Sequence, residues 1–244
     1  IFEAVDKSKI LCQNSRSSPY SSLQSLLKKI KMSQTNNNHP VVLGCEQIFN
    51  EGLHLIDGHR VGLITNHSGV DSLMKATADK LYSNKNCELI ALFGPEHGIR
   101  GSAQDGETVD SFNDPYKDVP AFSLYGKTRQ PNKEMLSQID RMLFDIQDVG
   151  VRFYTFLYTM SMSMEACADH DIPFIVLDRP NPIGGIICSG NILNPLFESF
   201  VGRYPIATRY GLTIGELANL FNNEFNIGVE LHVIRMKNWE RGYH

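Results

Sequence analysis

The chain has 244 residues, of which 42% are hydrophobic and 20% charged, and its formal net charge is −4. This balance is typical of a globular protein with a sizeable core, and it lacks the basic footprint of a nucleic-acid-binding protein. No apolar run approaches the about 18 residues that a membrane-spanning helix needs, so neither a nucleic acid nor a membrane is expected as a partner.

The first part of the chain carries little fold signal. Residues 1–40 are polar and rich in Ser, Asn and Gln, without the apolar core of a signal peptide. We interpret them as a disordered or non-native tail, and we place one domain over residues 41–244. With no signal peptide visible, a soluble cytoplasmic protein is the default expectation, and the oligomeric state stays open. The five cysteines are widely spaced and form no C-x-x-C pair, which favours buried free thiols over disulfides.

Short apolar runs alternate with helical patterns along the rest of the chain. The runs that predict strands are Arg60–Thr65, Leu89–Phe93, Ala121–Leu124, Arg141–Ile146, Ile172–Leu177 and Val229–Met236. Helical spacing occurs over Cys45–Leu55, Ser72–Ser83, Glu134–Ile139 and Thr155–His170, and a capping box at Thr213 opens a further helix. This alternation predicts an α/β fold with a parallel sheet. No G-x-G-x-x-G follows a strand, so no nicotinamide or flavin cofactor is expected.

Four of the predicted strands end in polar clusters. These are Asn66-His67, Glu96-His97, the segment from Asp145 to Tyr154, and Asp178-Arg179-Pro180-Asn181. The carboxyl ends of parallel strands meet at one edge of the sheet, where ligands bind in open α/β folds. The sequence therefore predicts a binding site at that edge. The long Gly- and Asp-rich segment 98–133 leaves the same edge and is interpreted as a lid or binding loop.

Glu96 is the candidate general acid. It follows an apolar strand and a Gly-Pro pair, a position that removes part of the hydration of a carboxyl group, as general acids require. The alternative is a carboxylate that caps a loop amide or pairs with Arg100. Neighbouring residues of an extended segment point in opposite directions, so His97 is as readily a structural side chain as a substrate contact.

The other strand-end residues have two readings each. Asp145, Asp148 and Arg152 either form a salt-bridge cluster of purely structural meaning or serve the site, and for Asp145 the structural interpretation is favoured. Tyr154 is either a core aromatic or a phenol in the crevice, and Arg179 either pairs with Asp178 or receives an anion. The arginines near these ends favour a pocket for a carboxylate or phosphate: Arg100, Arg129, Arg152 and Arg179. The histidines show no metal-ligand spacing, so no metal is expected.

Several long motifs together resemble one known family. They are Val61–Asn66, Leu92–Gly101, Ser123–Arg129, Phe144–Gly150, Arg152–Thr155, Leu177–Gly185 and Glu198–Gly202. In this order they closely resemble the NamZ-type exo-β-N-acetylmuramidases, from about residue 43 to the end of the chain.

The resemblance implies a glycosidase that removes terminal β-1,4-linked N-acetylmuramic acid from the non-reducing end of peptidoglycan fragments. It implies a Rossmann-like parallel sheet with helices on both faces, and a smaller C-terminal domain that this chain apparently lacks. Glu96 falls on the family's catalytic glutamate, and Tyr154 falls on a tyrosine near the scissile bond. The residues expected to bind the muramic-acid-containing saccharide are Asn66, His97, Arg100, Asp148, Arg152, Asp178, Arg179 and Asn181.

Three points stay open at this stage. The second catalytic group is Tyr154, Asp148 or the substrate's own acetamido group. The chain is alternatively a module that binds muramyl sugars without turnover. A phosphosugar enzyme that uses the same crevice and its arginines is the third reading.

Overall fold

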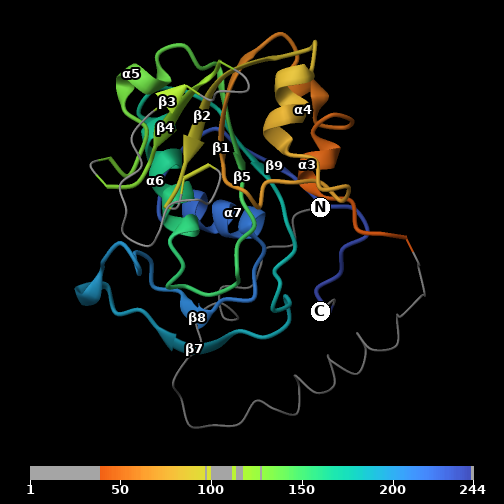
Figure 1. Ribbon diagram of the computed structural model, residues 1–244. Helices are drawn as coiled ribbons and strands as arrows, with labels where there is room; N and C mark the ends of the chain where they lie inside the picture. Colours follow the sequence, from red (N-terminus) through yellow and green to blue (C-terminus); the bar gives the residue numbers. More distant parts are fainter. Residues whose placement is uncertain (1–38, 97, 100–111, 114–117, 127, 243–244) are drawn as a thin grey trace.

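A seven-stranded sheet forms the centre of the computed structural model, which describes residues 39–96, 98–99, 112–113, 118–126 and 128–242 (Figure 1). The strands are β1 (Arg60–Thr65), β2 (Glu88–Gly94), β3 (Phe112–Asn113), β4 (Pro120–Ser123), β5 (Arg141–Asp145), β6 (Phe174–Leu177) and β9 (Leu231–Ile234). Their order is β3-β4-β2-β1-β5-β6-β9, and all pairs are parallel except β3 with β4. The predicted α/β, Rossmann-like fold is confirmed.

The strand order locates the crevice. From β1 the chain winds through β2 to β4 on one side, and then returns to place β5, β6 and β9 on the other side of β1. The winding direction therefore reverses between β1 and β5, and in open α/β sheets ligands bind outside the carboxyl ends of the strands at such a reversal.

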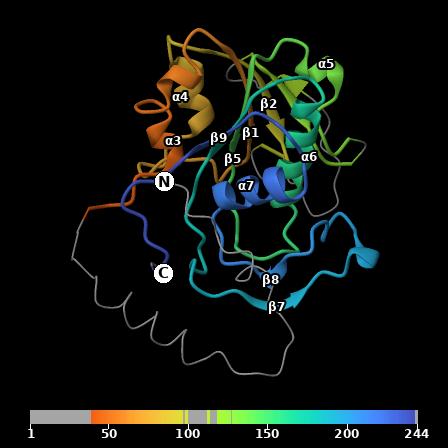
Figure 2. The ribbon, with the colours of Figure 1, turned by 180° about the vertical axis from the view of Figure 1, so that it is seen from behind.

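Helices cover both faces of the sheet, as the two opposite views show (Figure 1, Figure 2). The helices are α3 (Gly44–Gln47), α4 (Thr77–Ser83), α5 (Lys133–Leu136), α6 (Phe156–Ala168) and α7 (Ile214–Glu224). Helices α5, α6 and α7 contribute to one hydrophobic cluster, and α3 and α4 contribute to the other. Side chains of a strand alternate between the faces, so Met142 and Phe144 of β5 join the first cluster and Leu143 the second.

The four helices predicted with bounds are all shorter in the structure, and in two of them turns take the first or middle residues. The helix predicted over Ser72–Ser83 begins only at Thr77, since Asp71 Oδ1 accepts hydrogen bonds from the backbone N–H groups of Leu73 and Lys75 and closes a turn. The helix predicted over Cys45–Leu55 is split into α3 and the 3₁₀ turn η1 (Leu53–Leu55).

A two-stranded sheet was not expected from the sequence. Strands β7 (Ser189–Ile192) and β8 (Ala207–Arg209) pair antiparallel, and the 3₁₀ turn η2 (Pro195–Phe197) lies between them. Three of the four β7 residues are exposed, so no apolar alternation marks the strand in the sequence. Figure 1 shows this hairpin beyond the carboxyl ends of the central strands, where Thr208 O accepts a hydrogen bond from Arg152 N.

The cysteines are free, as the sequence predicts, where they fall on described residues. Cys45, Cys87 and Cys167 are free thiols, and Cys45 and Cys167 are buried. Within the described ranges, no helix has the length and apolar character needed to cross a bilayer. Most of the tail predicted over residues 1–40 lies outside the described residues, where only His39 and Pro40 are included.

Candidate functional site

Glu96 stands at the carboxyl end of β2, just after the buried Gly94 and Pro95. Its side chain is half-buried, and Oε2 accepts a hydrogen bond of 3.1 Å from Thr155 Oγ1. Thr155 is the residue that precedes α6, in the connection that follows β5. This bond therefore joins the two sides of the crevice, across the end of β1. His97 and Arg100, which the sequence placed beside Glu96, lie outside the described residues.

Tyr154 lies beside this hydrogen bond, one residue before Thr155. Its side chain is 38% exposed, and its ring meets the edge of the Phe156 ring at a centroid distance of 5.1 Å. Among the described residues, none is hydrogen-bonded to its hydroxyl. Of the two readings of Tyr154, the structure favours a phenol at the rim over a core aromatic.

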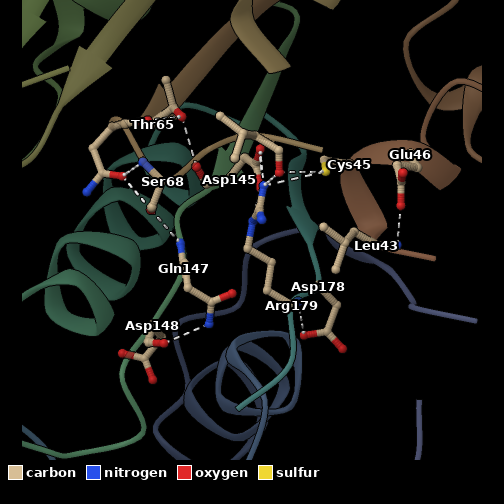
Figure 3. A network of polar contacts seen from close by, with 12 residues as sticks. Leu43, Cys45, Glu46, Thr65, Ser68, Asp145, Gln147, Asp148, Asp178 and Arg179 are labelled. Atoms are coloured by element: carbon tan, nitrogen blue, oxygen red, sulfur yellow. Dashed lines mark hydrogen bonds and ion pairs between the residues drawn. The ribbon is translucent and has the colours of Figure 1, made fainter. Parts of the chain in front are cut away.

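Asn66 shapes the bottom of the crevice, where the winding reverses. Its Oδ1 accepts hydrogen bonds from the backbone N of Ser68 (2.9 Å) and from Ser68 Oγ (2.6 Å). Ser68 Oγ in turn accepts a hydrogen bond of 3.0 Å from the backbone N of Gln147, after β5 (Figure 3). Gln147 Nε2 then donates to the carbonyl of Pro180, after β6 (2.8 Å). The buried Asn66 thus begins a chain of bonds that ties the ends of β1, β5 and β6 together.

Arg179 is buried and pairs with Asp145, not with Asp178. Its Nε and Nη2 lie 2.6 Å and 2.9 Å from the two carboxylate oxygens of Asp145, and the two side chains are 4% and 0% exposed. Nη2 also donates to the carbonyl of Val70 and approaches Cys45 Sγ at 3.4 Å (Figure 3). The guanidinium of Arg179 therefore holds protein segments together beneath the crevice.

Asp178 and Asn181 fasten the connection after β6 to the start of α7. Asp178 accepts hydrogen bonds from the backbone N of Gly215 (2.8 Å), from Thr213 Oγ1 (3.0 Å) and from the backbone N of Arg179 (3.0 Å). Asn181 Nδ2 donates to the carbonyl of Leu212 at 2.8 Å. Both side chains are buried, and burial raises the pKa of the Asp178 carboxyl to about 6.

Asp178 is expected to make stability depend on pH. In the unfolded chain its carboxyl ionises near pH 4, whereas the folded pKa is about 6. Between these values the folded chain keeps a proton that the unfolded chain has lost, so the free energy of unfolding falls as the pH rises from about 4 to about 6. Urea unfolding across this range should show that fall, and Asp178→Asn should remove roughly 3 kcal/mol of it at most.

Asp140→Asn is the control for this measurement. Arg60 lowers the pKa of Asp140 to about 2, so that carboxyl stabilises the fold above about pH 4 and loses its effect as the pH falls toward 2. The Asp140 variant should therefore keep the wild-type decline between pH 4 and 6. An unchanged decline in Asp178→Asn would contradict the prediction.

Asp148 and Arg152 also bond within the protein. Asp148 is 4% exposed; its Oδ2 accepts hydrogen bonds from Gly150 N (2.9 Å) and the Tyr210 hydroxyl, and burial raises the carboxyl pKa. Arg152 Nη1 donates to the carbonyls of Asn191 and Ile206, each at 2.6 Å. Asp145, Asp148 and Arg152 therefore form no common salt-bridge cluster, because each has a different partner. The structural interpretation of Asp145 agrees with its buried pair with Arg179.

The structure separates the predicted residues into two groups. Glu96 is bonded to Thr155, which directly follows the exposed Tyr154 and was not among the residues predicted from the sequence. The other described candidates make hydrogen bonds within the protein: Asn66, Asp148, Arg152, Asp178, Arg179 and Asn181. Only Oδ2 of the Asp148 carboxylate is bonded, whereas Oδ1 is buried and has no partner among the described residues. In the part of the chain that is described, no group of three or more His, Cys, Asp or Glu residues could hold a metal ion. A carboxyl and a phenol at the rim are suited to proton transfer.

Comparison with known proteins shows the family to which the chain belongs. Residues 61–244 match the family model described as exo-beta-N-acetylmuramidase NamZ, N-terminal. The peptidoglycan beta-N-acetylmuramidase NamZ of Bacillus subtilis (strain 168) is 51% identical over 209 residues, which cover 86% of this chain and 50% of that protein.

Two crystal structures of DUF1343 family proteins from Bacteroides fragilis share the fold. One has a TM-score of 0.78 at 44% identity, over 83% of this chain and 52% of that chain. The other has a TM-score of 0.71 at 34% identity, over 84% of this chain and 54% of that chain. The chain thus spans about half the length of the relatives it matches.

Proposed function

The chain belongs to the NamZ exo-β-N-acetylmuramidase family, whose N-terminal part it matches, and from this membership we propose that it is a glycoside hydrolase. Its reaction would be the release of β-1,4-linked N-acetylmuramic acid from the non-reducing end of peptidoglycan fragments. The observation that carries the proposal is the half-buried carboxyl of Glu96, bonded to Thr155 and next to Tyr154 at the crevice rim.

Glu96 would act as the general acid. Because Glu96 Oε2 already accepts a hydrogen bond from the Thr155 hydroxyl, the proton to be delivered would be carried by Oε1. Transfer of this proton to the glycosidic oxygen lets the bond between that oxygen and the anomeric carbon break, with the electron pair going to the oxygen. Water then adds to the anomeric carbon, and its proton returns to the Glu96 carboxylate.

Tyr154 is a better candidate than Asp148 for the second catalytic group. Asp148 is 4% exposed and its bonded oxygen already accepts two hydrogen bonds, so a sugar has no direct access to it. Tyr154 is exposed at the rim, within one residue of the bond partner of Glu96. The substrate's acetamido group is the alternative.

The buried strand-end residues would support the site without touching the sugar. Asn66 and Arg179 bond to the loop that follows β1, and Asn181, which follows β6, bonds to Leu212 just before α7. Catalytic groups need such loops to be held in place. His97 and Arg100 stay proposed substrate contacts. The cytoplasmic location expected from the sequence also stays a prediction.

Binding of muramyl sugars without turnover is the second candidate. Most glycosidases use two carboxyl groups, and Glu96 is the one acid at the described strand ends of this edge that is not buried. Asp145, Asp148 and Asp178 are at most 6% exposed. This observation favours either a one-carboxyl mechanism or a binding module.

The deciding experiment measures the release of chromophore from a β-N-acetylmuraminide and from the matching β-N-acetylglucosaminide. Turnover of the muraminide alone supports the hydrolase. Calorimetric binding of N-acetylmuramic acid by a folded chain that releases no chromophore supports the binding module. Absence of both turnover and binding overturns both candidates.

Tyr154→Phe is expected to lower kcat for the muraminide by about 10- to 100-fold with little change in KM, because it removes only the hydroxyl to which we assign the second catalytic role. Stability should be unchanged, since no described residue bonds to this hydroxyl. Tyr82→Phe, at another exposed position, is the matched control. If the variant has the kcat of the wild type, Tyr154 is not the second catalytic group, and the substrate's acetamido group takes its place.

A further inference from the structure

The segment after β4 brings one arginine toward the same edge as Glu96. Ser123, the last residue of β4, pairs with Gly94, and the backbone N of Leu124 donates to the carbonyl of Gly94 at 2.8 Å. Glu96 follows Gly94 by two residues, and Arg129 follows Leu124 by five. The two side chains therefore leave from neighbouring strand ends, on the side of β1 where the sheet continues through β2 and β4.

The ring of Phe200 packs against the guanidinium group of Arg129. The Arg129 guanidinium carbon lies 4.1 Å from the centroid of the Phe200 ring, and the Tyr125 ring lies 6.4 Å from the same ring. Phe200 belongs to the turn in which Ser199 and Gly202 bond to each other, and it packs partly against the main core. A guanidinium stacked on a ring keeps its charge, and its N–H groups stay free to donate in the plane of the fork.

Five other described arginines at this end of the molecule already have acceptors. Arg152 and Arg209 donate to main-chain carbonyls, and Arg179 pairs with Asp145. Arg203 pairs with Glu165 and Glu198, and Arg241 pairs with Glu216. Arg129 is exposed, and within the described residues no ion pair or hydrogen bond joins it to an acceptor.

We propose that Arg129, stacked on Phe200, binds the lactyl carboxylate of the terminal sugar and so sets the preference for N-acetylmuramic acid over N-acetylglucosamine. The inference rests on the proposed function, since the lactyl ether is the group by which these two sugars differ. A planar guanidinium fork matches a carboxylate with two parallel hydrogen bonds. The contact with Phe200 restrains the guanidinium before the sugar arrives, and this lowers the entropy lost on binding.

The test compares two chromogenic substrates that differ only in charge: the β-N-acetylmuraminide and its neutral lactyl methylamide. The wild type should prefer the free acid. Arg129→Ala should lower kcat/KM for the free acid by about 10- to 100-fold and leave the methylamide unchanged, because a hydrogen bond to a charged group is lost only with the acid. Phe200→Leu should give a smaller loss, again confined to the acid.

Arg60→Ala is the matched control. Arg60 is also exposed, but it is the first residue of β1 and so lies at the amino ends of the strands, where it pairs with Asp140 at 2.8 Å. This variant should keep the wild-type preference for the acid. Thermal unfolding of all variants checks that each one is folded.

The outcomes separate this inference from the function on which it rests. If the wild type hydrolyses the muraminide and Arg129→Ala keeps the preference for the acid, the assignment of Arg129 is overturned. Loss of the preference in Arg100→Ala alone would overturn it in the same way and assign the carboxylate to Arg100. If the wild type hydrolyses neither substrate, the hydrolase proposal fails, and calorimetry with N-acetylmuramic acid and N-acetylglucosamine still tests Arg129. Equal binding of N-acetylmuramic acid by wild type and Arg129→Ala would overturn the inference.

Discussion

Glu96→Gln is expected to lower kcat for muraminide hydrolysis by about 10²- to 10⁴-fold. The amide has nearly the shape of the carboxyl group and can still accept the hydrogen bond from Thr155 Oγ1, but it cannot deliver a proton to the leaving oxygen. KM should change little, because the lost interaction develops mainly in the transition state. The measurement is initial rates over a range of substrate concentrations and pH values.

Glu88→Gln is the matched control for this variant. Glu88 is the first residue of β2, the strand that ends next to Glu96. It is exposed at the amino ends of the strands, away from the carboxyl ends where Glu96 lies. The same substitution there should leave kcat unchanged. A substrate with an acidic leaving group, which needs no protonation, should recover much of the activity of Glu96→Gln. Normal turnover by Glu96→Gln would assign the acid to another residue.

Thr155 gives this prediction a finer test. Thr155→Val removes the donor to Oε2 while keeping the shape of the side chain, so the Glu96 carboxyl loses the bond that fixes it across the crevice. A smaller fall in kcat is expected than for Glu96→Gln, together with a shift in the pH profile. A merely structural threonine would change stability and leave the pH profile as it was.

The architecture was predictable because its signals are local. Buried parallel strands appear as continuous apolar runs, and β1, β2 and β5 are found within one residue of the predicted bounds at each end. Glu96 and Tyr154 stay predictions as catalytic residues, and the sequence singles them out because each follows a recognisable run and is part of a motif shared with one family. The hairpin β7–β8 was missed, because its exposed residues carry no apolar alternation.

The roles of the strand-end residues were less predictable, because the sequence places a polar residue at an edge without giving the direction of its side chain. Arg179 follows Asp178 directly, yet its guanidinium reaches Asp145, 34 residues away. Asn66 looks like a ligand contact in the sequence, yet it bonds to Ser68, two residues on. Buried polar groups must find partners, and at this edge the nearest partners are the neighbouring loops.

The buried pair of Arg179 and Asp145 carries the largest expected effect on stability. Asp145→Asn should lower the free energy of unfolding by about 3–5 kcal/mol, because it leaves the guanidinium buried without a counter-charge. Asp140→Asn removes an ion pair with Arg60 whose partners are 44% and 31% exposed, so it should cost at most about 1 kcal/mol. Urea unfolding measures both, and similar small losses would contradict the prediction.

The same substitution tests whether the buried pair supports catalysis through the loops that it joins. Arg179 Nη2 bonds to Val70 after β1 and to Asp145 at the end of β5, and the connection after β5 also carries Thr155, the partner of Glu96. If the pair supports catalysis in this way, Asp145→Asn should lower kcat even at a temperature where the variant is fully folded.

Replacing both members of the pair by apolar residues, as in Asp145→Leu with Arg179→Met, removes the uncompensated charge and should restore much of the stability. Because the double variant still lacks the bonds to Val70 and Asp145, its kcat should stay low. Full activity of a stable double variant would show that the pair contributes to folding alone.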